Sequence, residues 1–259
     1  MTNGLIVLPE VGSTNDAVRS LAAEQFVPEF SVIVSGNQTA GRGRLGRVWV
    51  APPGGTIAIS VLLRPTLRGG EPLGTSHFGW FPLIAGEAIR RAVHNTVPES
   101  RVGLKWPNDV QIDGAKVSGI LTELLPDAAS LVVGVGVNLA LTKAELPVPT
   151  ATSLALAGAT LSGDELADAV LTGFMTELRA LCGDFVALGG DAAASGILDA
   201  VSDMCTTLGQ EVRVHLPSGS DLVGVATAID SSGRLVVRSS ADGHISAVAA
   251  GDVTHLRYE

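Results

Sequence analysis

The chain has 259 residues, of which 46% are hydrophobic and 17% are charged, and its formal net charge is -9. A chain of this length buries a full core, and its composition is that of an ordinary globular protein rather than a disordered one. The excess of 26 acidic over 17 basic residues argues against a broad nucleic-acid-binding face or a polybasic membrane surface, because both need clustered positive charge.

The first elements alternate strand and helix. Residues 5–8 (LIVL) predict a strand, and residues 13–25 predict a helix whose start is marked by Ser13 and Asp16 ahead of an apolar stripe. Strands are expected at 31–35 and 55–63, with a Gly/Arg-rich loop between them. The run at 5–8 is too short for a signal peptide.

The middle of the chain begins with an amphipathic helix at about 76–97. A strand at 101–106 ends in Trp-Pro-Asn-Asp, and residues 110–124 predict a hairpin because Asp113-Gly114 separates two strand-like runs. Another strand covers 130–141, the longest apolar run, which is far below the roughly 20 residues that a bilayer needs. The sequence therefore predicts a cytoplasmic protein outside membranes.

The pattern changes near residue 207. An alanine-rich helical region at 163–207 gives way to about five short strands separated by turn residues, which is typical of a small antiparallel barrel. We predict an α+β fold with two domains, residues 1–207 and 208–259.

The loop GRGRLGR, from Gly41 to Arg47, is a local cationic exception in an acidic chain. Its letters match GxGxxG, but no helix follows and no acidic residue is placed to hold a ribose, so a dinucleotide site is rejected. A P-loop is rejected as well, because Arg47-Val48 stands where Lys-Ser/Thr is needed. What remains is a loop that suits a small anion, or else a solvated surface loop.

The strand at 130–141 has an unusual face. Because side chains alternate, Gly134 and Gly136 lie on one face beside Asn138, while three valines lie on the other. Two glycines in succession leave a trough, which either a ligand or tight packing fills.

The predicted hairpin places Lys105, Asn108, Asp109 and Lys116 near its edges. By alternation Lys116 shares a face with Ser118, and Gly119 faces the other way. Lysines near a turn are more often solvated than catalytic, so both interpretations stay open. The five histidines have no metal-site spacing, and no metal site is predicted from the residues.

Five segments, taken in order and spacing, resemble the biotin protein ligase family: GSTND (12–16), NQTAGRGRLGRVW (37–49), GLKWPNDV (103–110), GAKVSGILTE (114–123) and VGVGVNL (133–139). The resemblance spans residues 10–140, and the C-terminal strands are similar to that family's small SH3-like domain. It implies a catalytic domain related to class II aminoacyl-tRNA synthetases. It also implies activation of biotin with ATP and Mg²⁺ to biotinyl-5′-AMP, and transfer to a lysine of a biotin carboxyl carrier domain such as that of acetyl-CoA carboxylase.

The resemblance also assigns site residues. The catalytic cations would be Arg44 and Lys116. Biotin would contact Ser13, Thr14, Asn15, Gln38, Gly41, Arg42, Gly43, Arg44, Lys116 and Gly119. The nucleotide would contact Arg44, Trp49, Lys105, Asn108, Lys116 and Asn138. The glycine-rich loop would close over the adenylate and keep water from it.

Two alternatives and one departure bear on this interpretation. A lipoate-protein ligase has a related fold but lacks the GRGRxGR wording, and a non-catalytic biotin-binding regulator could share the scaffold. Many bacterial relatives carry an N-terminal DNA-binding domain, whereas here the first motif begins at Gly12, so we expect a ligase without DNA binding. The oligomeric state is left open.

Overall fold

The computed structural model describes residues 4–49, 51–216, 220–249 and 252–256. Seven strands form its first sheet: β1 (Leu5–Leu8), β2 (Val32–Ser35), β3 (Thr56–Leu63), β4 (Val102–Lys105), β5 (Asp109–Ile112), β6 (Ala115–Leu124) and β7 (Leu131–Asn138). Their order is β1-β2-β3-β7-β6-β5-β4. The pair β1–β2 is parallel and the other pairs are antiparallel, so the sheet is mixed.

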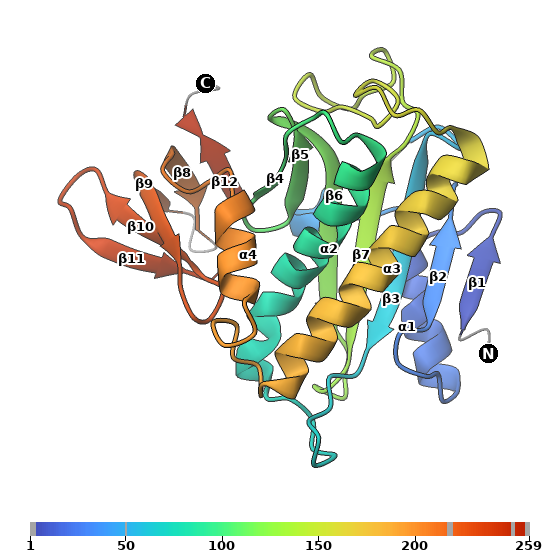
Figure 1. Ribbon diagram of the computed structural model, residues 1–259, viewed down its shortest axis with the longest axis horizontal. Coiled ribbons are helices and arrows are strands. Elements are labelled where there is room, and N and C mark those ends of the chain that lie inside the picture. Colours follow the sequence, from blue (N-terminus) through green and yellow to red (C-terminus); the bar gives the residue numbers. More distant parts are fainter. Residues whose placement is uncertain (1–3, 50, 217–219, 250–251, 257–259) are drawn as a thin grey trace.

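Helices cover both faces of this sheet (Figure 1). They are α1 (Thr14–Glu24), α2 (Phe81–Thr96), α3 (Gly163–Ala187) and α4 (Ile197–Met204). Helices α2 and α3 pack together over the main apolar core, while α1 closes a smaller core on the opposite face. Because β7 lies between the two cores, its valines are buried on both sides. Among the described residues, no helix has both the length and the apolar character required for a bilayer span.

Two helix starts follow from local chemistry. Ser13 caps α1 by accepting a hydrogen bond from the Asp16 backbone N–H, as the sequence predicted. The helix expected at about 76–97 is divided: residues Thr75–Trp80 form a 3₁₀ turn, and α2 begins only at Phe81. Pro82 stands in the first turn of α2, where its missing N–H leaves no intrahelical bond unmade.

The predicted hairpin is confirmed, and it contains a bulge that the sequence did not reveal. Asp113 and Gly114 both have positive φ, at 50° and 86°, as a two-residue turn between antiparallel strands requires. In the β5–β6 register, Gln111 pairs with Lys116 but Val110 pairs with Ser118, so one residue of β6 is extra. The expected alternation, with Lys116 and Gly119 on opposite faces, is therefore wrong. Lys116 lies on the same face as Gly119, because a Cβ added to Gly119 would be 3.2 Å from Lys116 Nζ.

A second, antiparallel sheet follows α4. Its strands are β8 (Glu211–His215), β9 (Asp221–Ile229), β10 (Leu235–Ser239), β11 (Ile245–Val248) and β12 (Asp252–His255), in the order β11-β10-β9-β8-β12. Figure 1 shows this sheet beside α4 at the β4 side of the first sheet. The mixed α+β architecture with a C-terminal antiparallel sheet agrees with the sequence prediction.

Two tryptophan indoles join the sheets. Trp80 Nε1 donates to the Ser231 carbonyl at 2.9 Å, and Trp106 Nε1 donates to the Gly233 carbonyl at 3.1 Å. Both side chains are buried. The turn between β9 and β10 is thereby fixed against the 3₁₀ turn before α2 and against the segment that follows β4.

His255 lies close to the same contact. Its Nε2 is 3.3 Å from Thr207 Oγ1, which accepts a hydrogen bond from the Trp106 backbone N–H. Burial, followed by the positive charge of Lys105, lowers the pKa of His255 to about 4. The imidazole is therefore neutral at physiological pH and adds no positive charge near Lys105.

Candidate functional site

A cavity of about 400 Å³ lies between β6, β7, the start of α1 and the arginine loop, Gly41–Arg47. The predicted site residues that line it are Ser13, Thr14, Asn15, Gln38, Arg42, Gly43, Arg44, Trp49, Lys105, Asn108, Lys116, Gly119 and Asn138. Gly41 does not line this cavity but borders a second one. The structure thus brings together residues from five separate sequence segments.

One end of the cavity is formed mainly by hydroxyl and amide groups, with Arg42 also in the lining. Gln38 Oε1 accepts a hydrogen bond from the Thr14 backbone N–H at 2.8 Å and lies 3.1 Å from Thr14 Oγ1. Ser60 Oγ, on β3, lies 2.7 Å from Thr14 Oγ1 and 2.6 Å from Asn15 Oδ1. The hydroxyl and amide groups are held by one another, so their geometry is set before any ligand arrives.

The middle of the cavity is the glycine trough predicted on β7. A Cβ on Gly134 would lie 2.2 Å from Asn15 Oδ1, and one on Gly136 would lie 2.5 Å from the Trp49 ring. Both glycines are therefore required for close approach, here of side chains rather than backbone. Trp49 Nε1 is buried and has no hydrogen-bond partner among the described residues. A ligand acceptor would satisfy it.

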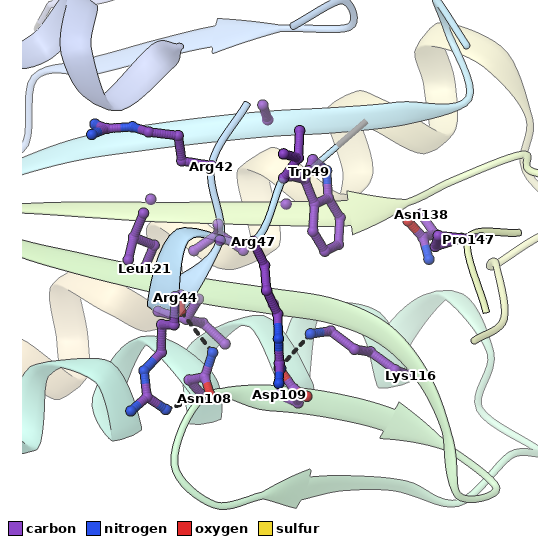
Figure 2. Close-up of a pocket in the computed structure, with 18 of the residues that line it drawn as sticks. Arg42, Arg44, Arg47, Trp49, Asn108, Asp109, Lys116, Leu121, Asn138 and Pro147 are labelled. Carbon is purple, nitrogen blue, oxygen red and sulfur yellow. Dashed lines mark hydrogen bonds and ion pairs between the residues drawn. The ribbon is translucent and has the colours of Figure 1, made fainter. Parts of the chain in front are cut away.

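The other end is charged. Lys116 Nζ forms an ion pair with Asp109 Oδ1 at 2.6 Å and lies 5.8 Å from the centroid of the Trp49 ring (Figure 2). Arg44 Nη1 donates to Asn108 Oδ1 at 2.9 Å, and Asn108 Nδ2 donates to the Ile120 carbonyl. Asp109 is the one carboxylate among the described residues that line this cavity.

Two further predicted residues lie at strand ends. Lys105 ends β4 and lines the cavity. Asn138 ends β7 and is buried, and its Nδ2 donates to the Thr152 carbonyl at 2.9 Å. This bond orients the carboxamide and fixes the loop after β7 against the cavity.

The arginine loop is a narrow hairpin. Gly43 N–H donates to the Arg47 carbonyl at 2.7 Å, and Trp49 N–H donates to the Gly41 carbonyl at 2.9 Å. Its turn has positive φ at Leu45 and Gly46, of 55° and 74°. A Cβ on Gly41 would lie 2.4 Å from the Trp49 carbonyl oxygen, so this glycine serves close approach within the loop itself.

The arginine loop also separates two cavities. The second cavity, of about 750 Å³, shares loop residues 42–45, 47 and 48 with the first, together with Asn108, Ile120 and Leu121. It extends to Pro82 at the start of α2 and to Gly233 in the turn between β9 and β10. Leu45 and Val48 are exposed hydrophobic residues at its edge. Displacement of the loop would therefore remove the wall between the two spaces.

Arg42 differs from the other arginines of the loop. Its Nη2 lies 2.7 Å from Asp16 Oδ1 and 3.3 Å from Glu123 Oε2. Figure 2 shows its side chain directed away from Lys116 and Asp109. The guanidinium is therefore committed to protein carboxylates, which sequence spacing could not show because Glu123 is 81 residues away.

The arrangement suits one kind of ligand: a neutral polar head, an apolar body and an anionic tail. Hydroxyl and amide groups would meet the head, apolar lining residues such as Ile120, Leu121 and Val135 would meet the body, and lysine and arginine would meet the tail. Asp109 lines this cavity, and Ser60 contacts two lining residues, Thr14 and Asn15, although the sequence assigned neither Asp109 nor Ser60 a role. Among the described residues, no group of three or more histidine, cysteine or carboxylate side chains is placed to hold a metal ion.

Two family descriptions match the chain. Residues 7–138 match the biotin/lipoate A/B protein ligase family, and residues 207–256 match the biotin protein ligase C terminal domain. The chain is 36% identical over 256 residues to the biotin–acetyl-CoA-carboxylase ligase of Mycobacterium tuberculosis, covering 98% of this chain and 89% of that protein. It is 27% identical to the bifunctional ligase/repressor BirA of Escherichia coli, covering 96% and 73%.

Solved structures show the same similarity. A biotin protein ligase from Aquifex aeolicus in complex with biotin and ATP has a TM-score of 0.73 and 27% identity, covering 97% of both chains. A biotin protein ligase from Leishmania major in complex with biotinyl-5-AMP has a TM-score of 0.62 and 25% identity, covering 96% of this chain and 100% of that one.

Proposed function

Because the chain belongs to the biotin/lipoate A/B protein ligase family, we infer that it is an ATP-dependent biotin protein ligase. It forms biotinyl-5′-AMP from biotin and ATP and then transfers biotin to a lysine of a carrier protein. The relatives named as biotin–acetyl-CoA-carboxylase ligases support biotin over lipoate as the substrate, and they support an enzyme over a non-catalytic regulator.

One observation carries the proposal: a single cavity joins an end rich in hydroxyl and amide groups to a cationic end, with apolar side chains in the wall between them. Biotin has the matching order of groups, with a neutral ureido ring, an apolar body and a carboxylate. Thr14 and Gln38 would meet the ureido ring, while Lys116 would meet the carboxylate. ATP would extend past Arg44 and Asn108 toward Lys105.

The first chemical step needs cations. The carboxylate oxygen of biotin attacks the α-phosphorus of ATP, a new P–O bond forms, and pyrophosphate leaves. Two anions must approach each other, so Lys116 and Arg44 would neutralise both and stabilise the charge that develops in the transition state. The Asp109 ion pair holds Lys116 Nζ at the cavity wall, ready to turn to the substrate.

In the second step, the carrier lysine attacks the acyl carbon and AMP leaves. The nucleophile comes from the carrier, so the chain supplies position rather than a covalent intermediate. We propose a biotin carboxyl carrier domain as this partner, as the names of the relatives suggest.

We also propose that the reaction uses Mg²⁺, bound together with the phosphates of ATP. Mg²⁺ is commonly held by one or two carboxylates together with substrate phosphates. Asp109 offers one such carboxylate beside the cationic end, and this donor set fits Mg²⁺ only when phosphates complete it. The ion would offset charge on the phosphates, next to Lys116 and Arg44.

We also retain finer structural assignments as proposals: a class II aminoacyl-tRNA-synthetase-like catalytic domain, an SH3-like C-terminal domain and a boundary near residue 207. The separate second sheet supports them. The cytoplasmic location is likewise a prediction from sequence.

Pyrophosphate exchange tests the proposed function. The purified chain with biotin and Mg²⁺ is expected to move labelled pyrophosphate into ATP, and lipoate is expected to support no exchange. Exchange with lipoate but not with biotin would overturn the assignment. Transfer is then measured as biotin on a purified carrier domain, with a carrier lysine-to-alanine variant as the control.

Arg44→Ala is expected to release biotinyl-5′-AMP about tenfold faster, because the loop loses its bond to Asn108 and the adenylate loses a cation. Release is followed after rapid dilution, by filtration of preformed complex. The matched control is Arg101→Ala, an exposed arginine immediately before β4. Equal retention in Arg44→Ala and the unmodified chain would remove Arg44 from this role.

A further inference from the structure

Four charged side chains meet at the edge of the catalytic cavity, and one of them, Arg42, lines it. Glu123 Oε1 accepts from Arg19 Nη2 at 2.7 Å, and Glu123 Oε2 lies 3.3 Å from Arg42 Nη2. Asp16 Oδ1 lies 2.7 Å from Arg42 Nη2 and 3.1 Å from Arg19 Nη1. Two arginines and two carboxylates therefore join α1, β6 and the arginine loop. Glu123 supplies a contact between the loop and β6.

Glu123 also reaches the ligand cavity through Asn15. Asn15 Nδ2 donates to Glu123 Oε2 at 2.7 Å and is 3.3 Å from the Leu121 carbonyl oxygen. Its Oδ1 is 2.6 Å from Ser60 Oγ. The Asn15 carboxamide is buried and bonded at both ends, so its orientation depends on Glu123 as much as on the cavity.

The contacts form a ring that begins and ends beside the arginine loop. They run from Arg42 to Glu123, Asn15, Ser60, Thr14 and Gln38, and Gln38 lies three positions before the first loop residue. Exposed ion pairs taken singly contribute little. Glu123 is different, because its side chain is only 22% exposed and its two oxygens serve three donors, one of them buried.

We propose that Glu123 is a positioning residue that couples the polar end of the cavity to closure of the arginine loop. The inference rests on the proposed function. Ligand contact at Thr14 and Gln38 tightens the ring, the ring fixes Asn15 and Glu123, and Glu123 holds Arg42 so that the loop stays closed. Glu123 lines the second cavity and not the first, so it acts through Asn15 and Arg42 rather than on the substrate.

Glu123→Gln tests this role. The carboxamide keeps the size but removes the charge that pairs with two arginines. Release of preformed biotinyl-5′-AMP is expected to accelerate about tenfold, and KM for biotin to rise by a similar factor, while kcat of adenylation stays within about twofold. Salt is expected to speed release from the unmodified chain but to have little effect on the variant. Glu24→Gln, at the exposed end of α1, is the control and should match the unmodified chain.

A double-mutant cycle with Arg42→Gln separates coupling from direct ligand contact. If Arg42 acts through Glu123, the double variant releases adenylate no faster than either single variant. Additive effects would overturn the coupling, as would normal retention in Glu123→Gln. Failure of the unmodified chain to form any adenylate would instead contradict the proposed function, so the two failures are distinguishable. Circular dichroism and thermal unfolding of each variant identify a folding defect, and a variant that unfolds early is replaced by Glu123→Asp.

Discussion

Lys116→Ala is expected to lower the rate of biotinyl-5′-AMP formation by about 10³-fold. The lysine is the cation whose bulge-shifted strand position places it over Gly119, beside Trp49 and within 2.6 Å of Asp109. Removing it leaves two substrate anions with one fewer counter-charge at the point where they meet. The measurement is single-turnover formation of the adenylate in a quenched-flow experiment.

Two controls support that experiment. Lys143→Ala removes an exposed lysine in the loop after β7 and should leave adenylation unchanged. Lys116→Ala also leaves the half-buried Asp109 carboxylate without its lysine. Urea unfolding of Lys116→Ala, alone and combined with Asp109→Asn, therefore tests whether the unpaired carboxylate destabilises the fold. Adenylation within tenfold of normal in folded Lys116→Ala would assign the catalytic cation elsewhere.

Gly134→Ala is expected to abolish measurable biotin binding and to lower the free energy of unfolding by about 2–4 kcal/mol. The added methyl would overlap Asn15, whose nearest atom would be 2.2 Å away. Asn15 cannot move without breaking its contacts with Ser60 and Glu123. Calorimetry with biotin gives the affinity, and urea unfolding gives the stability.

Gly183→Ala provides the matched control for this substitution. Gly183 lies within α3, and an added Cβ there would meet nothing within 4 Å. Alanine in an exposed helix position is better than glycine by up to about 1 kcal/mol, so this variant should be slightly more stable and bind biotin normally. If Gly134→Ala also binds biotin normally, the added methyl group is accommodated without displacing Asn15, and the expected loss of binding is wrong.

Local signals predicted most of the fold. Asp113-Gly114 marked a turn whose two residues do have positive φ, and the Gly134 and Gly136 pair marked a trough that lines the cavity. The division before α2 was missed because a 3₁₀ turn directly ahead of an α-helix is itself helical, and the sequence gives no separate signal for the change. The bulge in β6 was missed because alternation assumes one partner for every residue.

The site was predictable where motifs carry chemistry and unpredictable where distant residues meet. Lys116, Arg44 and Thr14 were named from sequence, and the structure places them around one cavity, although their roles are still predictions. Glu123 and Ser60 gave no local signal, because each contacts partners at least 45 residues away in the sequence. The same holds for Gly233, whose carbonyl accepts the hydrogen bond from distant Trp106.

The placement of the three tryptophans has an optical consequence. Trp80 and Trp106 are sealed from solvent and bonded to backbone carbonyls, whereas the Trp49 indole lies against the lysine at the cavity wall. Emission from the first two should respond only when the C-terminal sheet separates from the first. A change in fluorescence when a ligand fills the cavity would arise from Trp49. The unlabelled chain therefore reports ligand binding through Trp49 and detachment of its second sheet through Trp80 and Trp106.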